Sequence, residues 1–133
     1  MRIMLDTNVI ISAFVLSSQP LTKMIDVISE NHTIVLSTYV IAELKRVVRE
    51  KFPDKYSLVE NFLQRLDFEL VYTPEVIDKS KFPEIRDKKD LPILVSAIIE
   101  NVDILISGDK DFIAVNVERP EILTSKSFVD KYC

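Results

Sequence analysis

Four acidic side chains of this 133-residue chain stand where their carboxylates could hold a divalent metal ion. Asp6 directly follows the apolar stretch 2–5, and Asp109 closely follows the apolar stretch 102–106. Apolar stretches with little polar alternation are typical of strands inside a parallel sheet, so both aspartates are expected at the carboxyl edge of that sheet, where ligands bind. Glu43 and Asp90 lie in the first turns of predicted helices that start from the same edge. The four acids are therefore expected to converge.

Convergent carboxylates repel one another, and this repulsion suggests that they bind a cation. Two unit charges about 5 Å apart repel by about 3 kcal/mol at an effective dielectric of about 20, so the cluster requires protonation or a cation. His32 is the only histidine and Cys133 the only cysteine, which leaves no ligand set typical of zinc. Oxygen ligands alone favour Mg²⁺ or Mn²⁺, and these ions usually meet phosphate groups.

Each acid also has a structural alternative when it is considered alone. Asp6 and Asp90 could cap the helices that follow them, which would stabilise each helix by ~1 kcal/mol. Asp109 could be a turn residue beside the only glycine. Glu43 could pair with Arg46 or Arg49 on its own helix. The coincidence of all four at one edge favours a joint function.

The rest of the chain must supply the strands and helices that bring these acids together. Apolar periodicity predicts strands at 2–5, 33–36, 68–72, 102–106 and 121–123. It predicts helices at 9–15, 21–30, 38–51, 55–66, 91–101 and 125–131, with Ser37 or Thr38 and then Asp54 as caps of the third and fourth. Strands that alternate with helices indicate an α/β fold, a three-layer α/β/α arrangement around a central parallel sheet of four to five strands.

Composition predicts one globular domain that spans residues 1–133, with 47% hydrophobic and 29% charged residues. No apolar run approaches membrane-spanning length, and the first residues enter a strand without the features of a signal peptide, so a cytoplasmic location is expected. The net charge of −4 argues against a global positive field that would hold nucleic acid. Local contact stays open, because basic residues cluster on the helix 38–51 and in the segment 79–89.

Four motifs together resemble those of the PIN domain family. They are the segment 5–9 (LDTNV), the helix that carries Glu43, the segment 87–90 (DKKD) and the segment 107–112 (SGDKDF). In length and element order the chain is similar to the PIN-type ribonuclease toxins of prokaryotic toxin–antitoxin pairs. The resemblance implies a parallel sheet commonly ordered 3-2-1-4-5. It also implies hydrolysis of single-stranded RNA by a water that Mg²⁺ or Mn²⁺ activates.

Position by position, the resemblance implies roles for individual residues. Asp6, Glu43, Asp90 and Asp109 match the family's catalytic, metal-binding acids, and Asp111 matches a further metal-binding acid. Asn8 matches a residue that helps to position the first aspartate, and Ser107 matches the hydroxyl residue before the fourth acid. Asp87 adds a carboxylate without an assigned role. Candidates for guiding the RNA strand are the basic residues Lys45, Arg46, Lys88, Lys89 and Lys110.

The resemblance also implies protein partners. PIN-type toxins suggest a cognate antitoxin protein and a homodimer. Apolar residues near Phe14, Val15 and Leu16 are expected to be exposed and to suit an interface between two copies of the chain.

Two other functional classes remain as alternatives. A phosphorelay receiver domain also gathers aspartates at the carboxyl edge of a parallel sheet, but its first strand is expected to end in paired acids, whereas Asp6 stands alone. A catalytically silent PIN-like module would keep the fold and bind RNA or a protein partner without cutting.

Overall fold

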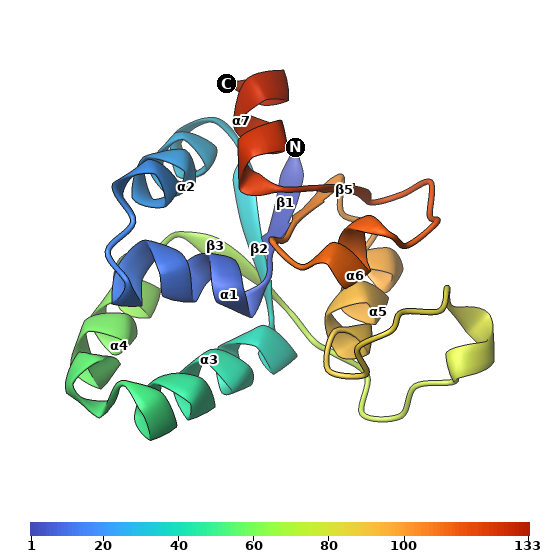
Figure 1. Cartoon of the computed structure of the whole chain (residues 1–133), viewed down its shortest axis with the longest axis horizontal. Coiled ribbons are helices and arrows are strands. Elements are labelled where there is room, and N and C mark those ends of the chain that lie inside the picture. Colours follow the sequence, from blue (N-terminus) through green and yellow to red (C-terminus); the bar gives the residue numbers. More distant parts are fainter.

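A computed structural model describes all residues from Met1 to Cys133 and contains a five-stranded, all-parallel sheet (Figure 1). The strands are β1 (Arg2–Leu5), β2 (Thr33–Ser37), β3 (Phe68–Val71), β4 (Ile104–Ile106) and β5 (Glu121–Leu123). Their order is β3-β2-β1-β4-β5, which confirms both the predicted fold class and the order implied by the family resemblance. Ile3 lies opposite Ile34 of β2 and Ile104 of β4, so the middle strand is paired on both sides.

Helices cover both faces of this sheet, as the pattern of apolar strands predicts. Figure 1 shows α1 to α4 on one side of the strands and α5 and α6 on the other. The helices are α1 (Thr7–Ile10), α2 (Gln19–Asn31), α3 (Thr38–Lys51), α4 (Tyr56–Arg65), α5 (Leu91–Ile99), α6 (Lys110–Ile113) and α7 (Ser125–Tyr132). A π-helical turn (Ile11–Val15) continues α1, and short 3-10 turns occupy Pro53–Lys55 and Lys79–Lys81. None of the helices is both long and apolar enough to cross a membrane.

The core lies between the sheet and these helices. Ile3, Met4 and Leu5 of β1 are fully buried, as are Val40, Leu44 and Val48 on the inner face of α3. The spacing of these α3 residues matches one face of a helix, so their burial holds α3 against the sheet. Each such side chain contributes roughly 1.5–3 kcal/mol by leaving water.

Local capping explains where the helices begin, with one exception to the sequence prediction. The Ser37 side chain accepts a hydrogen bond from the backbone N–H of Val40 at 3.1 Å, as the predicted cap of α3 requires. The prediction that Asp54 caps the next helix is wrong. Pro53 starts a 3-10 turn that includes Asp54, and α4 then begins at Tyr56 without a side-chain cap. Pro92 lies in the first turn of α5, where its missing N–H is tolerated.

A small hydroxyl network joins the two helices that carry Glu43 and Asp90. The backbone N–H of Thr73, just beyond β3, donates to the Thr38 hydroxyl at 3.0 Å, and the N–H of Tyr39 donates to the Thr73 hydroxyl at 3.3 Å. Thr73 Oγ1 also lies 2.8 Å from Ser96 Oγ on α5. These bonds fix the start of α3 beside α5 at the carboxyl edge of the sheet.

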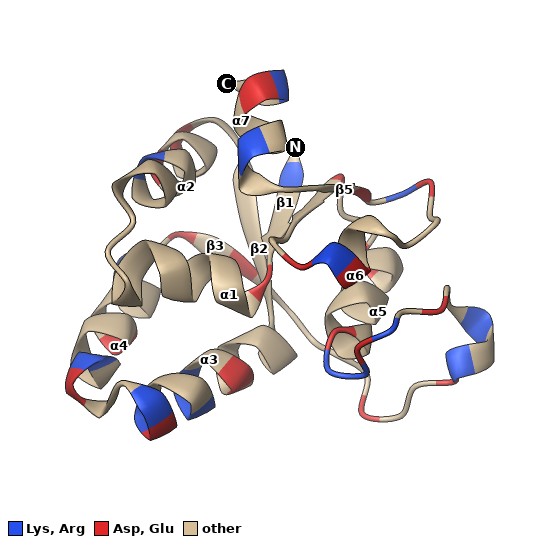
Figure 2. Cartoon of the chain, in the orientation of Figure 1, with Lys and Arg blue, Asp and Glu red and all other residues tan.

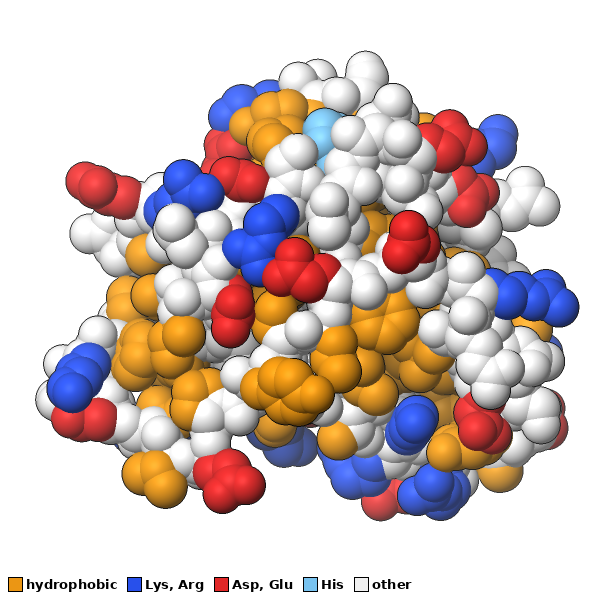
Figure 3. All heavy atoms as spheres, turned by 180° about the vertical axis from the view of Figure 1, so that it is seen from behind, with side chains coloured by type: hydrophobic (Ala, Val, Ile, Leu, Met, Phe, Trp, Pro, Cys, Tyr) orange, Lys and Arg blue, Asp and Glu red, His pale blue; other side chains and the backbone are white.

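Exposed apolar side chains are not where the sequence prediction placed them. Val15 is buried, and the Phe14 ring packs on Phe62 with 3.7 Å between ring centroids, so only Leu16 of that stretch is largely exposed. Seen from behind, hydrophobic side chains reach the surface across the middle of the molecule (Figure 3). The exposed large apolar residues of the chain include Leu70, Tyr72 and Ile99.

Candidate metal centre

Asp6 is a buried carboxylate at the end of the central strand. Only 3% of the residue is exposed, although it carries a side chain that is normally charged. Its Oδ1 accepts a hydrogen bond from the Val9 N–H at 3.0 Å, so it also caps α1, and its Oδ2 accepts one from the Ser107 hydroxyl. Burial raises the pKa of Asp6 above its ordinary value. The charges of Asp109 and Glu43 add to this rise, while the two hydrogen bonds oppose it.

Ser107 links the first acid to the fourth. It is fully buried at the end of β4, and its Oγ accepts a hydrogen bond from the Asp109 N–H at 3.0 Å while donating to Asp6. One hydroxyl therefore orients both aspartates. Asn8, by contrast, is exposed and its side chain makes no hydrogen bond, so its predicted role in positioning Asp6 stays a prediction.

Glu43 is held by neutral hydroxyls and not by an arginine. Its Oε1 accepts a hydrogen bond from the Thr7 hydroxyl at 2.5 Å, and its Oε2 accepts one from the Tyr39 hydroxyl at 3.4 Å. Arg46 pairs instead with Glu50 at 3.2 Å. Arg49 donates to the Tyr56 hydroxyl at 2.9 Å. The alternative that Glu43 pairs with Arg46 or Arg49 is therefore wrong, and its carboxylate keeps capacity for another ligand.

Asp90 is not the helix cap that its position suggests. It stands immediately before α5, but its side chain makes no capping hydrogen bond. Its Oδ2 is buried and is the only buried side-chain nitrogen or oxygen of the chain without a partner. Burial raises the pKa of Asp90 to about 8, with a further contribution from the adjacent Asp109 carboxyl. A buried, unpartnered carboxylate oxygen requires a proton or a cation.

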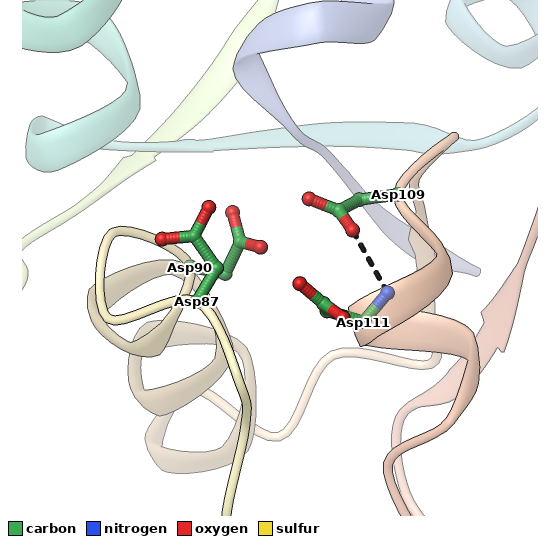
Figure 4. A group of neighbouring side chains, drawn as sticks. All are labelled: Asp87, Asp90, Asp109 and Asp111. Carbon is green, nitrogen blue, oxygen red and sulfur yellow. Dashed lines mark hydrogen bonds between the residues drawn. The ribbon is translucent and has the colours of Figure 1, made fainter.

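Four aspartates meet at this point (Figure 4). Asp87, Asp90, Asp109 and Asp111 each offer a carboxylate oxygen, and these four oxygens all lie within 4.8 Å of one another. They come from two segments, the turn before α5 and the start of α6. Asp109 Oδ1 accepts a hydrogen bond from the Asp111 N–H at 2.8 Å, so Asp109 is also the turn residue that its sequence context suggested.

Asp87 is the member that sequence reasoning left without a role. The Asp87 backbone oxygen accepts a hydrogen bond from the Asp90 N–H at 3.0 Å, and its Oδ1 accepts one from the Lys89 N–H at 2.9 Å. This turn brings the side chains of Asp87 and Asp90 together. The three-residue spacing of the two aspartates was a usable signal, because that spacing is typical of a tight turn.

These donors fit a hard divalent cation. Carboxylate oxygens without nitrogen or sulfur suit Mg²⁺ or Mn²⁺, and a cation would satisfy the unpartnered Asp90 oxygen and reduce the mutual repulsion. The group of four includes the predicted acids Asp90, Asp109 and Asp111. Asp6 and Glu43 lie outside it, although Asp6 is electrostatically coupled to Asp90, Asp109 and Glu43.

The basic residues predicted to guide RNA fall into two groups. Lys45 is half-buried and lines a small hollow with Glu60 of α4, and Arg46 is paired with Glu50. Lys88, Lys89 and Lys110 are exposed and form no ion pair. Of these five residues, only Arg46 is in an ion pair, and the three exposed unpaired ones belong to the loop before α5 and to α6.

Comparisons with known proteins agree with this architecture. A family model described as the PIN domain matches residues 2–111. The fold is similar to the crystal structure of VapBC2 from Rickettsia felis bound to a DNA fragment from their promoter, with a TM-score of 0.70 and 24% sequence identity. That alignment covers 92% of this chain and 97% of the other. No curated protein sequence matched the chain.

Proposed function

The chain belongs to the PIN domain family, and we propose that it is a metal-dependent endoribonuclease that hydrolyses phosphodiester bonds of single-stranded RNA. The observation that carries this proposal is the buried Asp90 oxygen without a partner, which lies among four converging aspartates. Buried polar atoms are normally paired, so this oxygen calls for a proton or a cation, and the three neighbouring aspartates favour the cation.

Each residue of the site has a physical task in this proposal. Asp90, Asp109 and Asp111 would hold Mg²⁺ or Mn²⁺ together with Asp87, and Asp6 and Glu43 would complete the negative environment. When bound, the ion would lower the pKa of a water molecule and offset negative charge that develops on the phosphate. Ser107 keeps Asp6 and Asp109 in register, and Thr7 and Tyr39 keep Glu43 oriented. The ion would also make this acidic site attractive to a phosphate group.

Chelation is expected to stop RNA cleavage. Without a cation the carboxylates repel both one another and a phosphate, so nothing offsets the charge of the transition state. The measurement is cleavage of a panel of single-stranded RNAs by purified protein in Mg²⁺, in Mn²⁺ and in excess EDTA. Equal cleavage with and without EDTA would contradict the metal mechanism. RNA binding without cleavage in every metal would favour the catalytically silent module.

We also propose that the chain is the toxin of a toxin–antitoxin pair. The family resemblance supports this, as does the structural likeness to VapBC2 from Rickettsia felis, whose structure was determined bound to a DNA fragment from their promoter. Expression of the chain in a bacterial host is expected to arrest growth, and co-expression of a cognate antitoxin is expected to restore it. Growth arrest that persists in an Asp6→Asn variant would show that toxicity does not come from this site.

A homodimer is expected, although not through the stretch first predicted. Because Val15 is buried and Phe14 packs on Phe62, an interface is better supplied by exposed apolar residues such as Leu70, Tyr72 and Ile99. Light scattering of the purified chain at micromolar concentration should give twice the mass of a single chain. The mass of one chain at that concentration would contradict the dimer.

A further inference from the structure

The long segment between β3 and α5 carries five basic side chains that form no ion pair. Lys79, Lys81, Arg86, Lys88 and Lys89 are all exposed, and none of them takes part in an ion pair or a side-chain hydrogen bond. Figure 2 shows blue residues on this loop, interspersed with red ones, both close to α5 and on the 3-10 turn that projects away from it. Elsewhere in the chain Arg2, Arg46, Arg119 and Lys131 each contact a carboxylate. The segment 72–90 also contains five acidic residues, so its formal charge is zero, and positive charge is in excess only where the basic side chains gather, as in the hollow described below.

Local structure holds these cations in place. Asp78 begins a 3-10 turn by accepting hydrogen bonds from the backbone N–H and the hydroxyl of Ser80, at 3.1 Å and 2.6 Å. Ile85 packs against the hydrophobic core and anchors the middle of the loop. The turn at Asp87 fixes its end, because two backbone N–H groups donate to that residue. The loop is thus ordered by two local turns and anchored to the core by Ile85.

The anchored loop surrounds a hollow of about 660 Å³. Its lining contains three basic residues, Lys79, Arg86 and Lys88, against one acidic residue, Glu84. Apolar parts of the lining come from Pro83, Ile85 and Leu91. Three cations around an open hollow suit a chain of phosphates, and the apolar surface suits the faces of unstacked bases.

This hollow adjoins the acidic site through a single turn. Lys88 lines the hollow, while its neighbour Asp87 contributes an oxygen to the four-aspartate cluster. Two adjacent residues of this turn therefore belong to two different sites, the basic Lys88 to the hollow and the acidic Asp87 to the aspartate cluster. On α3, Arg46 is already paired with Glu50, and Lys45 is half-buried in a small hollow that Glu60 also lines.

We infer that the hollow lined by Lys79, Arg86 and Lys88 binds the phosphate backbone of single-stranded RNA, so that the substrate strand reaches the acids from the α5 side and not across α3. This inference rests on the proposed function, because it supplies the substrate path to the proposed metal site. RNA is favoured over an acidic protein segment because Lys88 of the hollow directly follows Asp87 of the proposed metal site, where a bound cation would attract phosphate.

The test compares two variants with the same change of net charge. One is K79Q/R86Q/K88Q, and its matched control is K23Q/K51Q/K126Q, which removes three exposed lysines from α2, α3 and α7 that form no ion pair. Binding is measured by fluorescence anisotropy with a labelled single-stranded RNA of mixed sequence, at several salt concentrations and in EDTA, so that cleavage cannot interfere. Circular dichroism melts verify that both variants stay folded.

The loop variant should bind RNA at least about tenfold more weakly than the parent. The magnitude of the slope of log affinity against log salt concentration should fall by about 2, which is about 0.7 for each lost phosphate contact. The control should change both quantities much less. Equal losses in the two variants would show that only net charge matters and would overturn the inference. Unchanged affinity in the loop variant would also overturn it and would leave an acidic protein segment as the better occupant. If the parent binds RNA through the loop but does not cleave it in Mg²⁺, the RNA-binding role of the hollow is supported and the proposed nuclease function is contradicted.

Discussion

An Asp6→Asn substitution is expected to reduce RNA cleavage by roughly tenfold to a hundredfold and to leave the metal-free protein at least as stable as the parent. Activity is expected to fall because Asp6 contributes negative charge beside the proposed metal ligands. Replacing a residue that contacts a metal ligand, and not the metal itself, typically lowers metal affinity or activity by about 10–100-fold. Asparagine is nearly the same size as aspartate, so packing in this buried place changes little.

Stability is expected to move in the opposite direction because the Asp6 charge is unfavourable without metal. The residue is 3% exposed, its burial raises its pKa, and the charges of Asp109 and Glu43 oppose its ionisation. An amide can keep the hydrogen bond from the Val9 N–H but must rearrange the one with Ser107. That rearrangement costs about 1 kcal/mol, less than the ~3 kcal/mol by which a single carboxylate pair about 5 Å apart repels.

Thermal melts of both proteins, in EDTA and in Mg²⁺, measure the two effects separately. The parent should gain stability from Mg²⁺ by mass action, and the Asp6→Asn variant should gain less. Asp54→Asn is the matched control. Asp54 is exposed in the turn before α4, so this substitution removes the same charge at a place away from the site. Equal metal-induced shifts in the parent and the Asp6→Asn variant, or full activity in that variant, would refute the assignment of Asp6 to the site.

The metal-free protein is also expected to lose stability as the pH rises from about 4 to about 8. Burial and the neighbouring Asp109 raise the pKa of Asp90 from its ordinary 3.8 to about 8 in the folded state. Between these two values the folded protein binds more protons than the unfolded chain. The free energy of unfolding therefore falls with rising pH across this window, and the stabilising contribution is complete only below about 4.

An Asp90→Asn substitution should flatten this pH dependence, because the amide does not titrate. Asp90 is partly exposed, so solvent screening limits the effect to a difference in Tm of roughly 4 °C between pH 5 and pH 8, about what 1 kcal/mol produces in a chain of this size. Melts in EDTA across this range, with the exposed Asp67→Asn as control, provide the measurement. In Mg²⁺ the trend should reverse for the parent, since metal binding requires deprotonated ligands. An unchanged slope in the Asp90→Asn variant would contradict the raised pKa.

Local pattern accounts for most of the elements. The apolar stretches at 2–5 and 102–106 contain β1 and β4, and the spacing of Val40, Leu44 and Val48 marks the buried face of α3. These features are readable because the periodicity of burial in a strand or helix is a property of consecutive residues. The same pattern places Asp6 and Asp109 after their strands and Asp90 before its helix. The sheet order did not follow from periodicity. It was implied only by the family resemblance.

The tertiary structure alone decided which side chains meet. Glu43 could have paired with Arg46 on its own helix, but its carboxylate instead accepts a hydrogen bond from Thr7 of α1, and Arg46 pairs with Glu50. Asp87 joins Asp90 because a turn directs both side chains toward Asp109 and Asp111, which lie about twenty residues further along the chain. The unpartnered Asp90 oxygen likewise depends on everything packed around it. Contacts between distant segments and the burial of single atoms arise from the packing of the whole fold, so no pattern of neighbouring residues encodes them.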